Sequence, residues 1–451
     1  MAGEISRRGV ISAAVGAAVV PAVSRGSAEA SEPAQRPNVL VILADDLGWG
    51  DLSCYGSPLI RTPHLDQLAA DGIRFTNGYS AAAVCSPTRF ALYTGRYPGR
   101  LPGGLQEPIG GPNEQHGIPP EHPALGSLLK QAGYTTAMFG KWHCGYLPWF
   151  SPTKSGWDTF FGNFGGALDY YSKMSGNGRD LYEGEVPVES LDYYTDTIAD
   201  RAAEFVRARH DRPWLLNLNF TAPHWPWEAP GDLEVSKELT ARLAAGDRQA
   251  LVHNDGGTLE TYRKMVEAMD AGIGRVLSAL RDSGKERDTF VLFSSDNGGE
   301  RWSYEWPLSG NKGSLFEGGI RVPTIVRWPA HVLPDQESDV PVITQDWTAT
   351  ILRIAGTQPV PTHPLDGRDL VSYLVDTVVP GESDLFWRTR SARALRRGRW
   401  KFLRQGTNPD ALYDLITDPR ERANLAQRYP RIVSDLSASW EEINQELLPY
   451  P

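Results

Sequence analysis

The sequence has few cysteines and no long apolar run. Only three cysteines, Cys54, Cys85 and Cys144, occur among its 451 residues. This number is too small for a disulfide framework in a chain of this length. If Cys85 is committed to chemistry, Cys54 and Cys144 either pair with each other or stay free. No stretch reaches the roughly 20 apolar residues that a membrane-spanning helix requires, so we expect no membrane span.

The chain also lacks a surplus of positive charge, internal repeats and low-complexity segments. Its 55 acidic and 45 basic residues give a formal net charge of -10, which argues against nucleic acid as the main partner. A local cluster of cations can nevertheless bind a small anion inside an acidic protein. The length is sufficient for one large α/β domain plus a smaller one, with a sizeable buried core.

The first 30 residues have the pattern of a targeting segment. Ser6-Arg7-Arg8 precedes an apolar run of small residues over 9–23, and Ala28-Glu29-Ala30 offers a cleavage site. Paired arginines before a weakly hydrophobic, alanine-rich run resemble a twin-arginine export signal, and an ordinary secretory signal is the alternative. In both cases we exclude residues 1–30 from the fold and expect a bacterial protein that is exported to the periplasm or secreted.

Two short apolar segments end in polar residues that could bind a metal. Residues 38–43 and 289–293 are continuously apolar and rich in β-branched or aromatic residues, as is typical of buried parallel strands. The polar residues that follow them are Asp45, Asp46, Asp296 and Asn297. Because ligands bind beyond the carboxyl ends of such strands, we expect these side chains on one rim of the sheet. Their oxygen atoms suit Ca²⁺ or Mg²⁺ better than zinc, although solvated loop carboxylates and a simple turn are the alternatives.

The remaining patterns predict an α/β fold. Helical patterns alternate with strand-like runs such as residues 214–220, and they cover residues 64–72, 124–132, 194–208 and 259–280. This alternation predicts a large mixed, mostly parallel sheet flanked by helices. Near the end, residues 392–403 predict a hairpin with its turn at 397–398, and residues 430–448 predict an amphipathic helix. We therefore divide the chain into a catalytic domain, 31–365, and a smaller C-terminal α+β subdomain with a small antiparallel sheet, 366–451.

The most informative segment is residues 85–96, which read Cys-Ser-Pro-Thr-Arg-Phe-Ala-Leu-Tyr-Thr-Gly-Arg. Pro87 suits the first turn of a helix, and Cys85 lies just before it. The helix N-terminus and Arg89 both favour a thiolate, which predicts a reactive cysteine beside an anion site. A small buried cysteine is the alternative. A cysteine-dependent phosphatase is excluded, because its loop needs five residues between cysteine and arginine and this chain has three.

The same segment resembles the signature of type I sulfatases, Cys-x-Pro-x-Arg followed by four residues and Thr-Gly. All five fixed positions match, at Cys85, Pro87, Arg89, Thr94 and Gly95. Other segments similar to this family follow in order at 133–143, 223–226, 310–323 and 412–425. The resemblance implies the sulfatase fold of the alkaline phosphatase-like superfamily.

The resemblance also implies a modified nucleophile. In this family a separate maturation enzyme oxidises the cysteine to formylglycine, so we expect this change at Cys85. A geminal diol can expel sulfate by collapsing to the aldehyde, whereas a serine would be left as a slowly hydrolysed sulfate ester. The hydrate at position 85 would complete the metal shell, for which we expect Ca²⁺ with Mg²⁺ as the alternative.

Five further residues receive roles from the resemblance. Arg89 would hold the hydrate, while Lys141 and Lys312 would bind sulfate oxygens and stabilise the transition state. His143 would take a proton from the hydrate, and His224 would protonate the leaving oxygen. The alternative for each lysine alone is a solvated surface residue. The alternative for each histidine alone is a structural role. The division of work between the two histidines stays open.

Together these features predict a sulfatase that hydrolyses a sugar or aryl sulfate ester. Aromatic residues gather in segments 142–157, 225–227 and 302–306, where they could stack on a sugar or an aryl group or pack in the core. They favour a carbohydrate sulfate. The nearer alternative is a formylglycine-dependent phosphodiesterase or phosphonate monoester hydrolase. A non-catalytic exported binding protein is the more distant one, because binding alone would not require the whole residue set.

Overall fold

The computed structural model describes residues 36–451, so the export signal predicted over residues 1–30 lies outside the described residues. Within this part of the chain, all three cysteines are free thiols, which decides the open question about Cys54 and Cys144. None of its helices combines the length and the apolar character that a membrane crossing requires.

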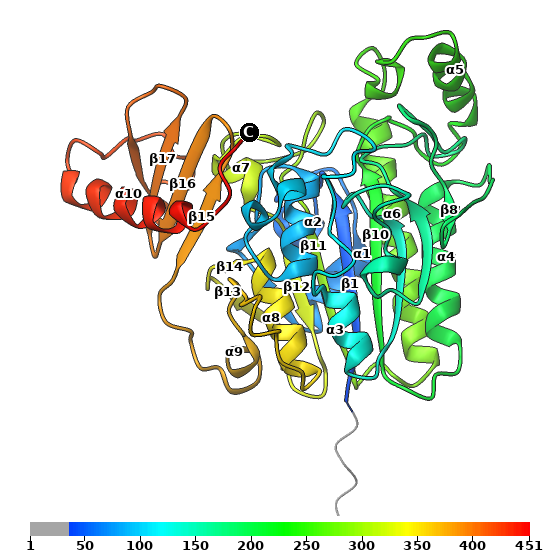
Figure 1. Ribbon diagram of the computed structural model, residues 1–451, viewed down its shortest axis with the longest axis horizontal. Helices are drawn as coiled ribbons and strands as arrows, with labels where there is room; N and C mark the ends of the chain where they lie inside the picture. The colour runs from blue at the N-terminus through cyan, green and yellow to red at the C-terminus, as the bar shows by residue number, and fades with distance from the viewer. Residues whose placement is uncertain (1–35) are drawn as a thin grey trace, which may run out of the picture. The chain divides into compact units, whose positions relative to one another are not determined.

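A mixed sheet of ten strands forms the core of the described chain (Figure 1). Its five central strands are parallel neighbours, in the order β11 (Thr289–Ser295), β1 (Asn38–Asp45), β10 (Trp214–Pro223), β4 (Thr135–Lys141) and β5 (Thr159–Asn163). Antiparallel pairs occur toward both edges, which are formed by β12 (Thr324–Arg327), β2 (Ile73–Phe75) and β13 (Gln336–Ser338) on one side and by β8 (Tyr182–Glu183) and β9 (Val186–Pro187) on the other. The predicted mixed, mostly parallel sheet is confirmed.

Both faces of the sheet are covered by helices, which explains why its central strands are apolar throughout. Successive residues of β1 belong to opposite cores: Val39 and Val41 to one, Leu40 and Ile42 to the other. The first core is closed by α2 (Cys85–Thr94), α3 (Leu125–Gln131), α8 (Thr344–Ile354) and α9 (Val371–Asp376). The second core is closed by α1 (Pro63–Ala70), α4 (Tyr194–Arg207) and α6 (Leu259–Asp282).

A separate antiparallel sheet follows near the end of the chain. Its strands are β15 (Asp384–Arg388), β16 (Ala392–Arg397), β17 (Trp400–Gln405) and β18 (Ala411–Asp414). One face packs against α10 (Pro430–Gln445), and the other packs against residues of the larger part, including Tyr79 and Ile320. The hairpin predicted over 392–403 is present, but its turn is at Gly398 and Arg399, one residue later than predicted. The domain boundary near residue 365 stays a prediction.

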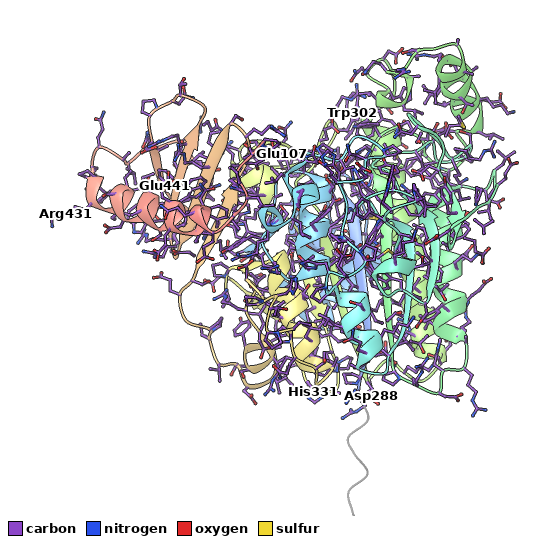
Figure 2. All side chains as sticks on the ribbon, in the orientation of Figure 1. Glu107, Asp288, Trp302, His331, Arg431 and Glu441 are labelled. Carbon is purple, nitrogen blue, oxygen red and sulfur yellow. The ribbon has the colours of Figure 1, made fainter. Side chains whose placement is uncertain are left out.

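Most short elements lie in the long connections between the strands. They are β3 (Gly78–Tyr79), β6 (Met174–Ser175), β7 (Gly178–Arg179), β14 (Val342–Ile343), α5 (Leu233–Ala244), α7 (Glu317–Ile320) and the 3₁₀ turns Ser53–Tyr55, Pro98–Arg100, Pro102–Leu105, Thr153–Ser155 and Ala250–Val252. Figure 2 shows Trp302 and Glu107 at the end of the sheet where the parallel strands finish, and Asp288 and His331 at the opposite end. The insertion with α5 also lies at the first of these ends (Figure 1).

We predict that His122 makes stability sensitive to acid. Burial, the neighbouring His363 ring and Arg96 lower the pKa of His122 to about 4. Because the unfolded chain binds this proton near its ordinary pKa of about 6.5, the free energy of unfolding should fall as the pH drops from about 6.5 toward about 4. Thermal unfolding of His122→Gln should show a shallower decrease over this range. Equal pH slopes for the wild type and the variant would contradict the assignment.

Candidate active site

The parallel strands bring the predicted site residues together at their carboxyl ends. Asp45 and Lys141 end β1 and β4, and the other residues follow β1, β4, β10 and β11 directly or lie on α2 and on the loop after β11. The residues brought together are Asp45, Asp46, Cys85, Arg89, Lys141, His143, His224, Asp296, Asn297 and Lys312. All of them are buried except Lys312, whose side chain is 14% exposed.

Oxygen atoms at this site fit a hard divalent cation. One ligand atom from each of Asp45, Asp46, Cys85 and His224 lies within 4.8 Å of the others. Among the described residues, Asp45 Oδ1 and Asn297 Oδ1 are buried and accept no hydrogen bond. Buried acceptors without a partner are costly, and carboxylate and amide oxygens are the ligands that Ca²⁺ and Mg²⁺ prefer.

Three carboxylates and three cations form a paired network in this buried region. Arg89 Nε donates to Asp296 Oδ2 at 2.9 Å, and Arg89 Nη1 donates to the Lys141 carbonyl at 3.0 Å. Lys141 Nζ contacts Asp45 Oδ2, and Lys312 Nζ contacts Asp46 Oδ2 at 2.7 Å. Buried charges need such pairing because their desolvation is expensive.

The pKa of Asp45 reflects its burial beside other carboxylates. Burial and the neighbouring Asp296 raise this pKa to about 8, despite the ion pair with Lys141. A divalent cation at these oxygens would offset the repulsion and favour the ionised carboxylates.

The prediction of a thiolate at Cys85 is wrong. Cys85 is the first residue of α2 and is 1% exposed. Burial raises the pKa of the thiol above its ordinary value, and Asp45 and Asp296 add to the effect of burial, which Lys141 and Lys312 do not overcome. Arg89, which was expected to help, binds Asp296 instead. The unmodified residue is therefore a neutral thiol.

Both histidines are neutral and have one ring nitrogen already in use. Burial and nearby lysines lower the pKa of His143 and of His224. His143 Nε2 lies 2.9 Å from the Ile109 carbonyl, so it carries the proton and leaves Nδ1 as a buried acceptor. His224 Nδ1 likewise lies 2.7 Å from the Trp225 carbonyl, and its Nε2 lies 3.5 Å from Asp46 Oδ2.

The backbone is strained at two of the site residues. Asp46 and His143 have φ values of 62° and 53°, in the left-handed region that residues with a side chain seldom adopt. Such conformations cost roughly 1–3 kcal/mol each and persist where the surroundings hold them. Gly95 of the signature also has a positive φ, 68°, and a Cβ there would lie 2.7 Å from Leu365. This packing explains the glycine in the motif.

A cleft of about 710 Å³ opens onto the buried cluster. Cys85, His143, His224 and Lys312 line it, together with glycines and small polar residues of the 165–177 segment. Tyr146, from the aromatic segment 142–157, also lines the cleft, and so do two charged side chains that the sequence analysis did not assign to the site, Arg248 and Glu300. Its volume is typical of a small-molecule site.

Comparison with known families agrees with this geometry. The family model described as Sulfatase matches residues 37–357. The chain belongs to the sulfatase family. It is therefore a sulfuric ester hydrolase, and the predicted family, fold and reaction class are confirmed.

Several relatives resemble this sulfatase over most of its length. N-acetylgalactosamine-6-sulfatase of Rattus norvegicus is 32% identical over 418 residues, covering 85% of this chain and 74% of the relative. Arylsulfatase A of Homo sapiens is 31% identical over 454 residues, covering 87% and 84%. The crystal structure of Ps i-CgsB in complex with k-i-k-neocarrahexaose superimposes with a TM-score of 0.82 at 29% identity, covering 92% and 94% of the two chains.

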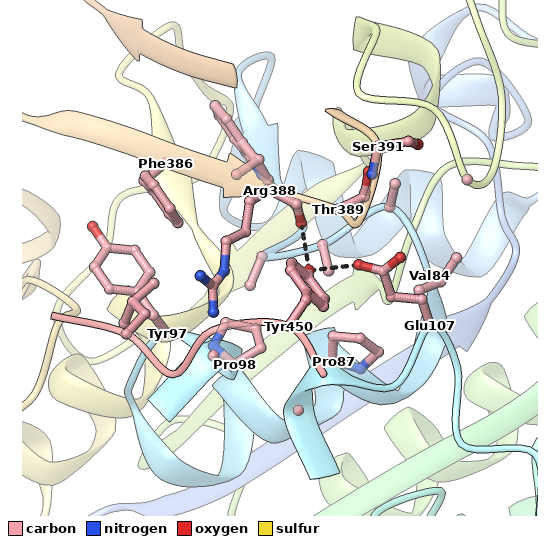
Figure 3. Close-up of a pocket in the computed structure, with 18 residues that line it drawn as sticks. Val84, Pro87, Tyr97, Pro98, Glu107, Phe386, Arg388, Thr389, Ser391 and Tyr450 are labelled. Carbon is pink, nitrogen blue, oxygen red and sulfur yellow. Dashed lines mark hydrogen bonds between the residues drawn. The ribbon is translucent and has the colours of Figure 1, made fainter. Parts of the chain in front are cut away.

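The loop that holds His143 in the sulfatase is itself held by the C-terminal segment. Glu107 accepts hydrogen bonds from the Tyr450 hydroxyl and from the Arg390 amide. Two residues later, the Ile109 amide donates to Ser86 Oγ at 2.9 Å, and the Ile109 carbonyl binds His143. Figure 3 shows Tyr450 reaching Glu107 beside a cavity of about 150 Å³ next to the start of α2.

We therefore expect Tyr450→Phe to impair turnover. The variant loses only the hydroxyl, which donates to Glu107 and also lies 3.4 Å from the Arg388 carbonyl, while its ring can keep its contacts with the guanidinium groups of Arg388 and Arg390. The Ile109 carbonyl should then position His143 less well, and a loss of about 1 kcal/mol in transition-state stabilisation corresponds to a roughly fivefold lower kcat with little change in KM. Tyr429→Phe is the matched control, because the Tyr429 hydroxyl has no hydrogen bond among the described residues. Equal kcat values for both variants in a sulfate-release assay would overturn this expectation.

Proposed function

We propose that this sulfatase removes sulfate from a saccharide by means of a formylglycine at position 85 and a divalent cation. The observation that carries the proposal is the position of Cys85, whose side chain lines the cleft and lies within the cluster formed by Asp45, Asp46 and His224. Lys312 lines the same cleft and supplies a positive charge for an anionic group. Oxidation requires a formylglycine-generating enzyme as a partner, and we propose that the mature protein is exported.

Asp45, Asp46, Asp296, Asn297 and the modified residue 85 would hold the cation. We propose Ca²⁺, with Mg²⁺ as the alternative, because the donors from Asp and Asn are all hard oxygens. When bound, the cation would polarise sulfate and lower the pKa of a hydroxyl group beside it. The formylglycine hydrate would supply that hydroxyl as the nucleophile, and its second hydroxyl would allow sulfate to leave.

The lysines would bind the sulfate group. Lys141 and Lys312 contact Asp45 and Asp46, and a cation on these carboxylates would weaken their hold on the two ammonium groups. The ammonium groups could then donate hydrogen bonds to sulfate oxygens and stabilise charge that develops there. Arg89 would hold the hydrate, while its contact with Asp296 keeps it in place.

The histidines would move protons. His143 Nδ1 is a buried acceptor, so we assign it the proton from the hydrate during sulfate release. His224 would donate a proton to the leaving oxygen. A bound sulfate near His224 Nε2 would raise the pKa of this histidine from its low value and thereby supply the acid that a poor alkoxide leaving group requires.

The lining of the cleft supports a saccharide as the substrate. Tyr146 and Trp225 offer aromatic surface on which a sugar ring can stack. Beside them, the amide of Asn177 can form hydrogen bonds with hydroxyl groups, and the glycines of the wall leave space for these groups. The names of the relatives point in the same direction. One is called N-acetylgalactosamine-6-sulfatase, and the solved structure of another holds k-i-k-neocarrahexaose.

The reaction depends on residue 85, so Cys85→Ala should abolish sulfate release. We would co-express the protein with a formylglycine-generating enzyme, confirm the aldehyde by mass, and assay a chromogenic aryl sulfate and its phosphate analogue. Cys54→Ala removes a thiol outside the cleft and is the control that should keep full activity. Residual turnover by Cys85→Ala would contradict the proposed nucleophile, and dominant phosphate hydrolysis would favour a phosphoester or phosphonate substrate.

Removal of His224 should lower kcat most for substrates with the poorest leaving groups. For His224→Ala we expect a loss in kcat of about 10²–10⁴-fold on a sugar sulfate, whose alkoxide needs a proton. On nitrophenyl sulfate, whose leaving group departs as an anion, the loss should be less than about tenfold. The plot of log kcat against leaving-group pKa would therefore become steeper. Parallel plots for the wild type and the variant would exclude His224 as the acid.

A further inference from the structure

The cleft is larger than the sulfate-binding residues need, and its outer wall carries charge of its own. Outside the residues assigned to catalysis, two charged side chains line it, Glu300 and Arg248. Glu300 Oε2 lies 3.9 Å from Lys312 Nζ, so this carboxylate belongs to the surroundings of the sulfate group. Arg248 is exposed and forms no ion pair or hydrogen bond with any residue in the range 36–451.

The backbone that carries Arg248 is firmly anchored. The preceding residue, Asp247, accepts two hydrogen bonds from Arg242 at 2.9 and 3.1 Å, so the adjacent carboxylate is already paired with another cation. Two and three residues later, Ala250 and Leu251 are buried, and Leu251 also lines the cleft. Arg248 therefore presents a free guanidinium group on a fixed segment beside the reaction site.

Arg301 connects this segment to the loop that carries Glu300. Its guanidinium group donates to the carbonyl oxygens of His253 and Asn254, at the end of the turn Ala250–Val252. The same group lies 5.2 Å from the Trp227 ring, close to the segment that carries His224. The segment that carries Arg248 is thus attached, through Arg301, to the loops that carry Glu300 and His224.

The chemistry of a free guanidinium group specifies its ligand. Arginine binds the planar edge of carboxylates and the oxygens of sulfate through two parallel hydrogen bonds, and such charge-assisted bonds are stronger than hydrogen bonds to a neutral hydroxyl. In the proposed function the sulfate that is cleaved is bound by Lys141 and Lys312 and attacked by residue 85, so Arg248 does not bind it. A ligand for Arg248 must bring a second anionic group.

We propose that Arg248 is a specificity-determining residue that binds a second sulfate or carboxylate on the saccharide, next to the sugar that loses its sulfate. The substrate class is therefore a polyanionic oligosaccharide rather than a singly sulfated sugar or an aryl sulfate. This inference rests on the proposed function.

The test compares Arg248→Ala with the wild type on two oligosaccharides that share one backbone. One carries a single cleavable sulfate, and the other carries an additional sulfate on the neighbouring sugar. We expect the ratio of kcat/KM for the doubly to the singly sulfated compound to fall about tenfold in Arg248→Ala, mainly through KM. Arg248→Lys should restore part of the ratio, because it keeps the charge but not the two parallel bonds.

Arg209→Ala is the matched control. It removes the same charge from an arginine outside the cleft, whose side chain is 93% exposed and whose Nε lies 3.4 Å from Asp211 Oδ1. The ratio should stay at its wild-type value in this variant. A third oligosaccharide, with a carboxylate in place of the additional sulfate, distinguishes the two kinds of second anion. The anion for which Arg248→Ala lowers the ratio more is the one that Arg248 binds.

The possible failures are distinguishable. If the wild-type protein with a confirmed aldehyde releases sulfate from none of the saccharides, the proposed function is wrong. If it releases sulfate but Arg248→Ala and Arg209→Ala change the ratio equally, or if neither changes it, the inference about Arg248 is wrong and the proposed function stands.

Discussion

The site depends on the burial of acidic side chains at the ends of two adjacent strands. Asp45 ends β1, Asp46 follows it and Asp296 follows β11, and all three are essentially inaccessible to solvent. Such a concentration of buried carboxylates is tolerated only where cations oppose it. Arg89, Lys141 and Lys312 provide this opposition, and each of these cations also has a proposed part in binding the hydrate or sulfate. The requirement for charge balance thus assembles the same groups that the chemistry needs.

The fold supplies these groups from distant parts of the chain. The carboxyl ends of the parallel strands β1, β4, β10 and β11 lie at the same end of the sheet, and the first residue of α2, Cys85, lies there too. The C-terminal sheet stabilises the loops of the site through contacts outside the cleft. Lys401 of β17 lies 2.8 Å from both Glu317 and Glu421, and Ser309 donates to the Arg420 carbonyl, so the segment around Lys312 is tied to the C-terminal part of the chain. Tyr450 performs a similar task for the loop that holds His143.

Much of the fold and of the site could be predicted from the sequence, because the signals were local. Continuous apolar runs identified the buried strands, and the signature around Cys85 identified the family. The strands β2 and β12, near one edge of the sheet, were not predicted, since each has only three or four residues and takes its stability from its neighbours. The neutral state of the Cys85 thiol was missed because burial, which depends on the whole fold, outweighs the local helix N-terminus.

The supporting contacts have no signal in the sequence at all. Tyr450 and Glu107 are 343 residues apart, and neither lies in a recognisable motif. Arg248 occurs in a segment with an ordinary polar composition, and only the folded chain shows that this segment lines the cleft. Contacts of this kind arise where two loops meet above the sheet, so they depend on the lengths and paths of both loops.

The central claim is that the buried carboxylates form one site for a hard divalent cation. Calorimetric titration of metal-depleted protein with Ca²⁺ and Mg²⁺ tests it most directly, because it needs neither a substrate nor the modified residue. The account predicts one site per chain, with affinity reduced at least tenfold in Asp45→Asn and unchanged in Asp335→Asn, where an exposed carboxylate far along the chain is replaced. Absence of binding to the wild type, or equal binding by Asp45→Asn, would contradict the account.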